Sequence, residues 1–355
     1  MRSIEEEKQA VIEWLMHPSE LGSKPKDIKF TKQFRTNDGI DCMIFKYKKS
    51  LLSPWLLAIA SESGIFSEMQ KYNQATEVVD ATKLVDFLAQ YWKNKANEVK
   101  EREEKAKNAG VFAGFVLLKE ASCDFSKFEK DFYDEWGITL SDSDQNNNMT
   151  KAYAVADFGE KAILALSLVE SPVPGGEAEQ NAQYNYMWRE AVQVAKSHNA
   201  HLIVSVVGAQ NPKVGGILFS MALAIVCRDV NTLGVYYNNI VVQPEYIFAG
   251  NEFLKKDQFP VLSLVWFGLS KSDKGVSAYT TGLRNLGKDE IEIVDVNKNP
   301  NEIRELLLNI ASYVIEEDVI LHAGETIGED NTQRLRIVKS EGVNVGGESL
   351  KILYE

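Results

Sequence analysis

Cysteine is scarce in this chain of 355 residues, which holds only Cys42, Cys123 and Cys227. The three are far apart, odd in number and without Cys-x-x-Cys spacing, which argues against a disulfide framework and a zinc knuckle. Histidine is also scarce, with four residues. The sequence contains neither a Gly-x-Ser-x-Gly nucleophile elbow nor a complete glycine-rich nucleotide motif. We therefore expect no metal and no cofactor.

Basic residues are fewer than acidic residues in this sequence. Lys and Arg total 39 against 51 Asp and Glu, a formal net charge of -12. Because nucleic-acid binders need a basic face to neutralise phosphates, this balance predicts no nucleic-acid partner, although it does not exclude a local basic patch. The same charge would repel an anionic membrane surface and would speed association with a basic protein partner.

Long apolar runs are missing. The longest lie near 217–226 and 261–269, well short of the ~20 residues that a membrane helix needs. The first eight residues lack the positive and apolar segments of a signal peptide. We therefore expect a soluble, cytoplasmic protein with no membrane association.

Hydrophobic residues make up 45% of the chain and charged residues 25%, so it can bury a core. A helical apolar pattern precedes Pro18, and strand-like runs follow at 26–35, 40–48 and 53–60. Asp38-Gly39 suits the tight turn of a hairpin between the first two runs. These patterns predict a small N-terminal domain of antiparallel sheet and helix at 1–92.

A long helix is expected at about 77–108. Its first half is amphipathic, whereas 93–107 is almost entirely charged and has little apolar face to bury. We interpret that half as a solvated helical linker, at 93–109, because acidic and basic residues are mixed along it.

The C-terminal part, 110–355, is expected to hold two ferredoxin-like (split βαβ) units. Strand 111–118, helix 125–136, strands 153–158 and 162–169, helix 177–198 and strand 201–207 follow each other in the order β-α-β-β-α-β. The second set comprises helices 213–228, 244–254 and 301–317 with strands 234–237, 261–269, 276–283, 291–294, 334–338 and 350–353. The predicted fold class is therefore α+β.

Two segments can be interpreted either as a chemical site or as a purely structural feature. His198 and His201 resemble a metal pair, but one should end a helix and the other begin a strand, so they do not share a helix face. Residues 207–216 follow a strand and precede a helix, as a phosphate cradle does, but they lack its glycine spacing and more simply connect two elements.

The candidate pocket or interface residues come from four segments. Trp188 lies near Tyr184 and Tyr186 after a Pro-rich loop, where aromatics either form a binding surface or pack on the sheet. Thr280, Thr281 and Arg284 end a strand with two hydroxyls and a cation, which either line a pocket or close a hairpin. The set is completed by Trp266, Tyr279, His322 and Glu325. His322 and Glu325 occupy a polar turn that also offers an acid and a base.

Several short motifs resemble the bacterial domain-of-unknown-function family 4261. They are FVLLKE at 115–120, PVPGGE at 172–177, HLIVSVVG at 201–208, WFGL at 266–269, YTTGL at 279–283, NIASY at 309–313 and GETIG at 324–328. The resemblance covers roughly 111–355, and Gly175 stands where similar sequences often carry Trp. The segments 55–57 and 66–73 are similar to a region that sometimes precedes this domain. The family implies no established activity and no catalytic residue.

The charge and the missing catalytic constellation favour a non-enzymatic protein-binding module. Similar small acidic cytoplasmic proteins occur beside bacterial toxin loci, which suggests an immunity-type protein that neutralises a toxin. The alternative is an enzyme or small-molecule-binding protein with a cleft between the two C-terminal units.

Overall fold

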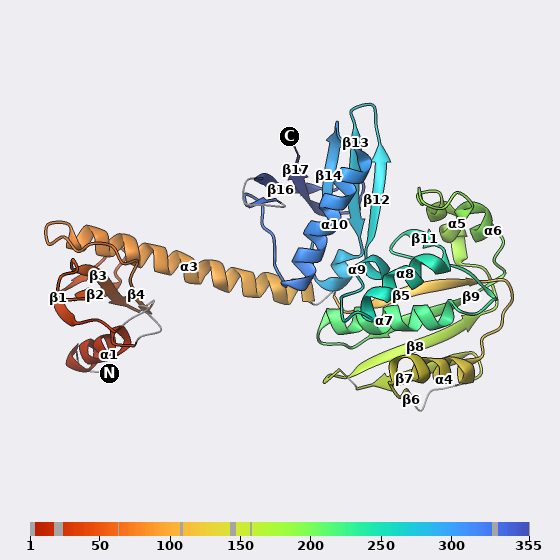
Figure 1. Ribbon diagram of the computed structural model, residues 1–355, viewed down its shortest axis with the longest axis horizontal. Coiled ribbons are helices and arrows are strands. Elements are labelled where there is room, and N and C mark those ends of the chain that lie inside the picture. Colours follow the sequence, from red (N-terminus) through yellow and green to blue (C-terminus); the bar gives the residue numbers. More distant parts are fainter. Residues whose placement is uncertain are drawn as a thin grey trace. The chain divides into compact units, whose positions relative to one another are not determined.

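The computed structural model describes residues 4–17, 24–62, 64–106, 109–142, 147–156, 158–328 and 333–354. The chain divides into two compact units, Met1–Glu101 and Arg102–Glu355 (Figure 1). Within the described ranges, none of the helices has both the length and the hydropathy to cross a membrane. The cytoplasmic location stays a prediction.

The N-terminal unit is an antiparallel sheet with a helix on each face. Its elements are α1 (Ile4–Leu15), β1 (Asp27–Arg35), β2 (Asp41–Lys48), β3 (Leu56–Ser61), β4 (Gly64–Phe66) and α3 (Glu77–Ala106). The strands follow the order β1-β2-β3-β4, so the sheet is the expected meander with one further short strand. Gly39, with φ 85°, makes the turn between β1 and β2.

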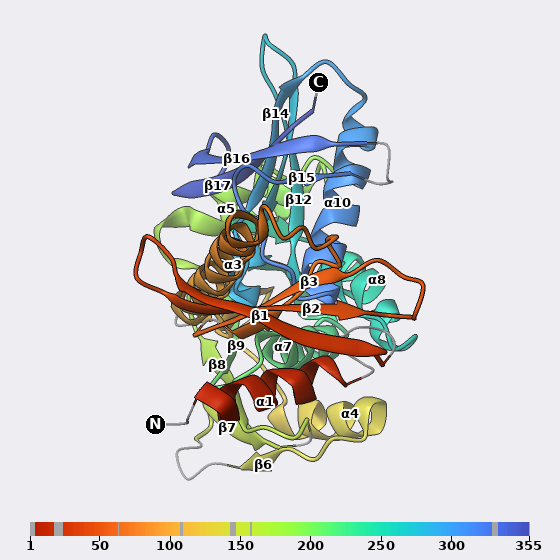
Figure 2. The ribbon, with the colours of Figure 1, turned by 90° about the vertical axis from the view of Figure 1, so that its left-hand side faces the viewer.

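Side chains alternate across this sheet, and each face is covered by a different helix (Figure 2). Phe45 and Tyr47 of β2 pack with Leu15 of α1. Ile44, on the other face, packs with Leu84 of α3. α3 continues past the division at 101 and is one helix throughout its described length.

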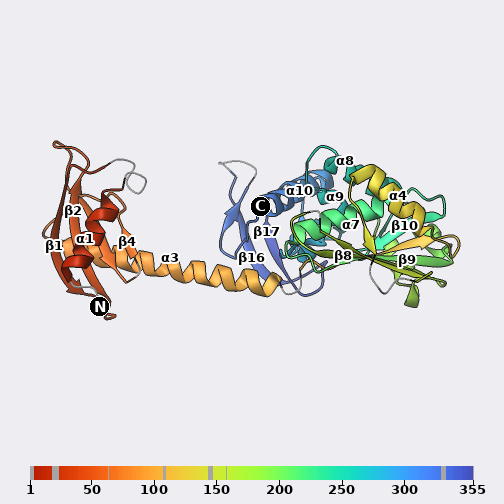
Figure 3. The same ribbon diagram turned by 90° about the horizontal axis from the view of Figure 1, so that it is seen from below.

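The first sheet of the C-terminal unit has the order β11-β10-β5-β9-β8-β7-β6. Its strands are β5 (Phe112–Leu118), β6 (Ser141–Asp142), β7 (Thr150–Val155), β8 (Ala162–Val169), β9 (Ala200–Val207), β10 (Thr232–Tyr237) and β11 (Ile240–Val242). α4 (Phe125–Trp136) and α7 (Pro212–Val226) cover one face (Figure 3), and the short helices α5 (Glu177–Ala182) and α6 (Ala191–Lys196) pack on the other.

The strand order of this sheet differs from that of a split βαβ unit. In a ferredoxin-like unit the strand order is 4-1-3-2, so the first strand pairs with the third. Here the fourth expected strand, β9, lies between the first, β5, and the third, β8. β10, which the sequence assigned to the second unit, pairs with β5 instead. The ferredoxin-like detail is therefore not confirmed, whereas the mixed α+β class is.

The second sheet has the order β12-β13-β14-β17-β16-β15. Its strands are β12 (Trp266–Lys271), β13 (Val276–Thr281), β14 (Ile291–Val296), β15 (Thr326–Ile327), β16 (Leu335–Glu341) and β17 (Glu348–Leu353). The pair β14–β17 is parallel, and α10 (Pro300–Glu316) packs against β12, β13 and β14. One continuous hydrophobic core joins this sheet to the first.

Two expected elements are broken. The helix expected at 177–198 is interrupted between α5 and α6, because the buried Asn185 accepts a hydrogen bond from Met187 N at 2.9 Å and donates one to Val241 O at 2.8 Å. The strand expected at 261–269 starts instead as a helical turn, α9 (Val261–Leu264), after Pro260. The remaining described helices are α8 (Pro244–Leu254) and the 3-10 turns η1 (Pro174–Gly176) and η2 (Leu283–Leu286).

Candidate functional site

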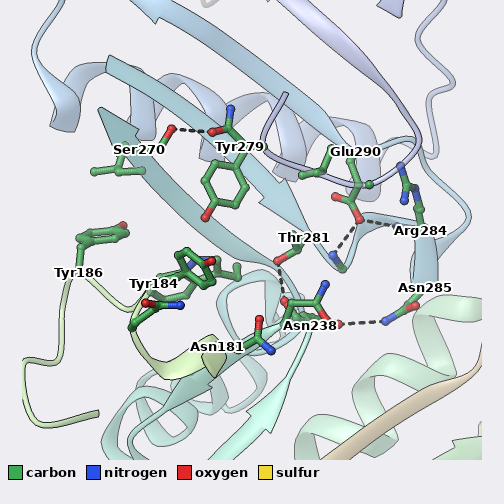
Figure 4. A pocket seen from close by; sticks show the side chains of 18 residues that line it. Asn181, Tyr184, Tyr186, Asn238, Ser270, Tyr279, Thr281, Arg284, Asn285 and Glu290 are labelled. Carbon is green, nitrogen blue, oxygen red and sulfur yellow. Dashed lines mark hydrogen bonds between the residues drawn. The ribbon is translucent and has the colours of Figure 1, made fainter. Parts of the chain in front are cut away.

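A cavity of about 750 Å³ lies between the two sheets of the C-terminal unit. Its walls come from the α5–α6 connection, the β10–β11 turn, the hairpin β12–β13, the segment that follows β13, and the β16–β17 turn. Figure 4 shows Tyr184 and Tyr186 approaching it from the α5–α6 connection and Tyr279 from β13. The lining is rich in aromatic rings and side-chain amides, and it includes the cation Arg284.

Tyr279 owes its place to a glycine on the neighbouring strand. Gly268 is directly opposite it in the β12–β13 ladder, and a Cβ atom at Gly268 would lie only 2.2 Å from the Tyr279 ring. The Tyr279 ring therefore packs directly on the backbone of Gly268, which has no side chain. Burial, followed by the nearby Tyr184 and Tyr186, raises the pKa of Tyr279 above its usual value, so its hydroxyl stays a hydrogen-bond donor.

Tyr186 ties the α5–α6 connection to the second sheet. Its hydroxyl donates to Phe267 O at 2.9 Å and accepts from Arg304 Nε at 2.8 Å. Its ring packs against Trp266, with the centroids 5.5 Å apart. This contact fixes one wall of the cavity against the other sheet.

Glu290 is a buried carboxyl at the cavity wall. Its Oε2 accepts a hydrogen bond from the Thr280 hydroxyl at 2.7 Å, and its Oε1 accepts from Gly282 N at 2.9 Å and Arg284 N at 3.4 Å. Burial raises the pKa of Glu290 although these donors act in the opposite direction. The carboxyl thus holds the N-terminus of η2 in place.

Glu292 lies two residues further on and plays the matching role for the β16–β17 turn. It accepts hydrogen bonds from Val343 N at 3.0 Å, from Asn344 N at 2.7 Å and from the Ser349 hydroxyl at 2.6 Å. Burial alone would raise the pKa of Glu292, but these donors outweigh it and hold the pKa below the usual value. Glu290, directly before β14, and Glu292, within β14, therefore each fix a turn that lines the cavity.

The β10–β11 turn is held by a network around Asn238. Its side chain donates to Leu264 O at 2.8 Å, and its backbone oxygen accepts from the Thr281 hydroxyl at 2.9 Å. Gly282 has φ 114°, and a Cβ atom there would lie 2.4 Å from Leu264 O, so this close approach requires glycine.

The structure brings together four of the eight candidate residues. Trp266, Tyr279, Thr281 and Arg284 line the cavity, and Thr280 lies behind it on Glu290. The other three are elsewhere. Trp188 packs against Gly234 of β10, and His322 and Glu325 contact each other in the polar turn before β15.

The two segments that resemble a metal pair and a phosphate cradle both form hydrogen bonds within the protein. His198 accepts a hydrogen bond from Val173 N at 2.8 Å, and His201 Nδ1 bonds Ser171 O at 2.8 Å, so the two rings hold the loop before η1. The carboxylate of Glu160 accepts from Gln210 N and Asn211 N directly before α7, so these backbone N–H groups already have a partner within the protein. Within the described ranges, no group of three or more His, Cys, Asp or Glu residues could hold a metal ion.

Sequence reasoning did not single out Glu290, Glu292, Asn238 or Asn344. The available signal was Glu-Ile-Glu-Ile at 290–293, where two glutamates alternate with apolar residues in a strand. That pattern normally marks a solvent-facing side of a sheet.

Comparison with family models adds one finding. Residues 279–353 match the domain of unknown function DUF4261. The match confirms the predicted resemblance and covers the C-terminal part of the expected range. Comparisons with curated proteins and with solved structures found no match.

The DUF4261 segment forms one side of the cavity. It contains Tyr279 and Arg284, the buried Glu290 and Glu292, and the Asn344 turn. The opposite side, with Tyr184, Tyr186 and Asn238, comes from residues that precede the match.

Proposed function

We propose that the C-terminal unit binds a small polar ligand in the cavity between its two sheets. The observation that carries this proposal is the cavity itself. Its volume of about 750 Å³ falls in the range of about 300–1,000 Å³ that is usual for small-molecule sites, and both sheets contribute to its walls.

The hydrogen-bonding groups of the lining indicate the class of ligand. Among the described contacts, the side chains of Gln183 and Asn239 and the hydroxyls of Tyr184 and Tyr279 have no hydrogen-bond partner within the protein. Amides and phenols both donate and accept, so they suit hydroxyl groups of a ligand. The neighbouring rings offer flat apolar faces. A sugar or another polyhydroxylated ring meets both conditions.

The charge of the lining limits the charge of the ligand. Among the described residues of the lining, Arg284 is the only cation, and one of its guanidinium nitrogens already donates to Glu348 O at 2.8 Å. Glu290 is the one acid in the described part of the lining and is buried. The ligand is therefore neutral or carries a single negative charge.

The lining supports binding rather than catalysis. Both oxygens of Glu290 accept hydrogen bonds from the protein, from Thr280 on one side and from backbone N–H groups on the other. A general acid or base needs a proton or a lone pair directed at the substrate. The buried glutamates instead preorganise the walls, which lowers the cost of ordering them on binding.

A thermal-shift screen of the full chain, followed by calorimetric titration, tests the proposal. The panel comprises neutral monosaccharides and disaccharides, their singly charged uronic acids, and nucleosides. We expect a sugar to raise the melting temperature. Tyr279→Phe should then raise the Kd roughly 2- to 10-fold, the usual effect of losing one neutral hydrogen bond. Tyr133→Phe, at an exposed position on α4, is the matched control.

Two results would contradict this proposal. One is a panel in which no compound stabilises the chain at saturating concentration. The other is a ligand whose Kd is unchanged by Tyr279→Phe and by Arg284→Gln, since such a ligand binds elsewhere.

A second candidate function is binding of a basic protein, as an immunity-type protein would do. The specific observation in its favour is the distribution of charge. Residues 1–101 contain 15 Lys and Arg and 15 Asp and Glu, whereas 102–355 contain 24 and 36, so the entire net charge of -12 belongs to the C-terminal unit. Such a unit attracts a basic partner over long range.

This candidate calls for a different experiment. Tagged full-length chain is used to capture partners from cells that naturally make it, with an unrelated protein of equal net charge as control. A stoichiometric basic partner that is retained at low salt and absent from the control supports it. An eluate identical to the control's would speak against it.

A further inference from the structure

The N-terminal unit carries a basic patch that its neutral overall charge conceals. Residues 24–49, which include β1 and β2, hold eight Lys and Arg against three Asp. The segment thus has a formal charge of +5 in a chain of net charge -12. Every residue of this segment lies within the described ranges.

Three of these lysines gather around one tryptophan. The ammonium nitrogens of Lys29, Lys46 and Lys48 lie 5.3, 5.2 and 5.0 Å from the ring centroid of Trp55. Lys46 also lies 4.8 Å from the ring centroid of Tyr72. We call these five residues the lysine–tryptophan patch.

The sheet register explains why these residues meet. Lys29 of β1 is directly opposite Lys46 of β2, and Lys46 is opposite Leu57 of β3. Lys48 lies two residues after Lys46, and Trp55 lies two residues before Leu57. Because side chains along a strand alternate between its faces, all these side chains share one face of the sheet. Tyr72 joins them because its backbone N–H donates to Trp55 O at 2.8 Å. The patch thus lies on the face that α3 covers further along the strands.

The charges of the patch are poorly neutralised. No two of its three ammonium nitrogens can be more than 10.5 Å apart, the sum of the two longest distances to the ring centre. That is about one Debye length at 0.1 M salt, so the three repel one another in the free protein. Two carboxylates lie at the patch: Asp27 Oδ2 is 3.4 Å from Lys29 Nζ, and Glu77 accepts a hydrogen bond from the Tyr72 hydroxyl at 2.7 Å. Within the described part of the chain, neither Lys46 nor Lys48 has a carboxylate at salt-bridge distance.

Cation–π contacts at exposed positions contribute only about 0.5–1 kcal/mol each. They hold the lysines near the ring without cancelling their charge, so an anion that enters the patch relieves the repulsion. The ring itself is only partly buried. A ligand that combines negative charge with flat rings would use both features.

We propose that the lysine–tryptophan patch binds single-stranded nucleic acid. Proteins of this kind combine lysine or arginine along the phosphate backbone with aromatic side chains on which bases stack. Trp55 and Tyr72 supply the aromatic faces beside the ammonium groups. The carboxylates of an acidic polypeptide such as polyglutamate would satisfy the lysines but offer no flat ring to the two aromatic faces. The proposal reverses the expectation drawn from total charge, which averages the patch with an acidic C-terminal unit.

The test is fluorescence anisotropy with the full chain and a labelled oligothymidylate of about 20 nucleotides, longer than the usual site of about 4–16. We expect saturable binding that weakens as salt rises. Lys29→Gln/Lys46→Gln/Lys48→Gln should reduce the magnitude of the slope of log K against log salt by roughly 2, at about 0.7 per phosphate contact. Trp55→Ala should weaken binding roughly 5- to 150-fold, and Trp55→Phe should retain most of it.

A matched control removes the same charge elsewhere. Lys196, Lys256 and Lys274 are exposed in the C-terminal unit, and changing all three to Gln should leave affinity and salt slope unchanged. Circular dichroism and the melting temperature establish that each variant is folded, and the Lys29→Gln/Lys46→Gln/Lys48→Gln variant carries the test if the alanine variant is not.

Three outcomes would overturn the proposal. The first is no anisotropy change at low salt. The second is an equal loss in the control triple variant, which would mean nonspecific attraction. The third is equally strong competition by polyglutamate, which would identify an acidic polypeptide as the partner.

Discussion

Asn344 donates two hydrogen bonds to one oxygen of Glu292, from its backbone N–H at 2.7 Å and from its side-chain amide at 3.1 Å. The same residue accepts a hydrogen bond from Ser270 of β12 at 2.6 Å. A single turn residue therefore connects a central strand of the second sheet to its edge strand, and the cavity lies beside this connection.

Replacing Glu292 by Gln should destabilise the C-terminal unit. The carboxylate is fully buried and accepts hydrogen bonds from four donor groups of Val343, Asn344 and Ser349. In the Gln variant, the NH2 group would replace one of the two acceptor oxygens and would point at these donors without being able to accept from them. We expect a loss of about 1.5–3 kcal/mol in the free energy of unfolding, measured by urea denaturation. Glu305→Gln, exposed on α10, is the control. Equal losses in both variants would show that Glu292 does not hold the turn.

The raised pKa of Glu290 predicts a particular dependence of stability on pH. Because the folded state binds the proton of Glu290 more tightly than the unfolded state does, this residue adds stability as pH falls through the folded pKa toward 4.5. Glu290→Gln lacks this contribution. Between about pH 8 and about pH 5, the wild type should therefore gain stability relative to the variant.

Glu292 has a lowered pKa and acts in the opposite sense, losing its contribution as pH falls below 4.5. It is present in both proteins, so its contribution cancels in the comparison. Denaturation midpoints at several pH values provide the measurement. A difference between wild type and Glu290→Gln that does not change with pH would contradict the prediction.

Gly282→Ala should distort the cavity wall. Its φ of 114° is unfavourable for alanine, and the added Cβ would press on Leu264 O at 2.4 Å. Backbone strain alone should cost about 1–3 kcal/mol. Gly346→Ala, in the same lining but with open space around its Cβ position, should change stability by no more than about 0.5 kcal/mol. Thermal unfolding of the two variants distinguishes them, and equal effects would count against the geometry.

Tyr186→Phe should loosen the α5–α6 connection. It removes the hydrogen bonds to Phe267 O and from Arg304, which should cost about 0.5–1.5 kcal/mol for each bond. Hydrogen exchange at residues 183–190 should become faster. Tyr184→Phe is the control, because the described contacts give the Tyr184 hydroxyl no partner. Unchanged exchange in Tyr186→Phe would show that the connection is held by other contacts.

Local signals predicted local structure well. Asp38-Gly39 indicated the first hairpin, and the aromatic face of 125–136 with Gly137 behind it indicated α4, whose N-cap is Asp124. In both cases the decisive contacts lie within a few residues of each other. The helix expected at 177–198 failed because Asn185 bonds to β11, 56 residues away, and nothing nearby in the sequence shows that contact.

The candidate site was predictable only in part, for the same reason. The YTTGL motif followed by Arg284 ends a strand with polar groups, so it was noticed and it does line the cavity. Glu290 and Glu292 were missed because their partners lie in turns formed by other segments, and burial of a strand face depends on what covers it. Strand order was missed because the order of elements along a chain does not determine which strands pair.

The position of β17 determines when the cavity can form during synthesis. This strand is inside its sheet, between β14 and β16, and it pairs Leu350 with Ile291. A ribosome must therefore release nearly sixty further residues after β14 before the sheet can close. Until then Glu292 is exposed to water and lacks the hydrogen bonds from Val343, Asn344 and Ser349 that stabilise its buried carboxylate in the folded protein. A nascent chain interrupted before residue 343 would carry a charged strand edge open to chaperones and proteases.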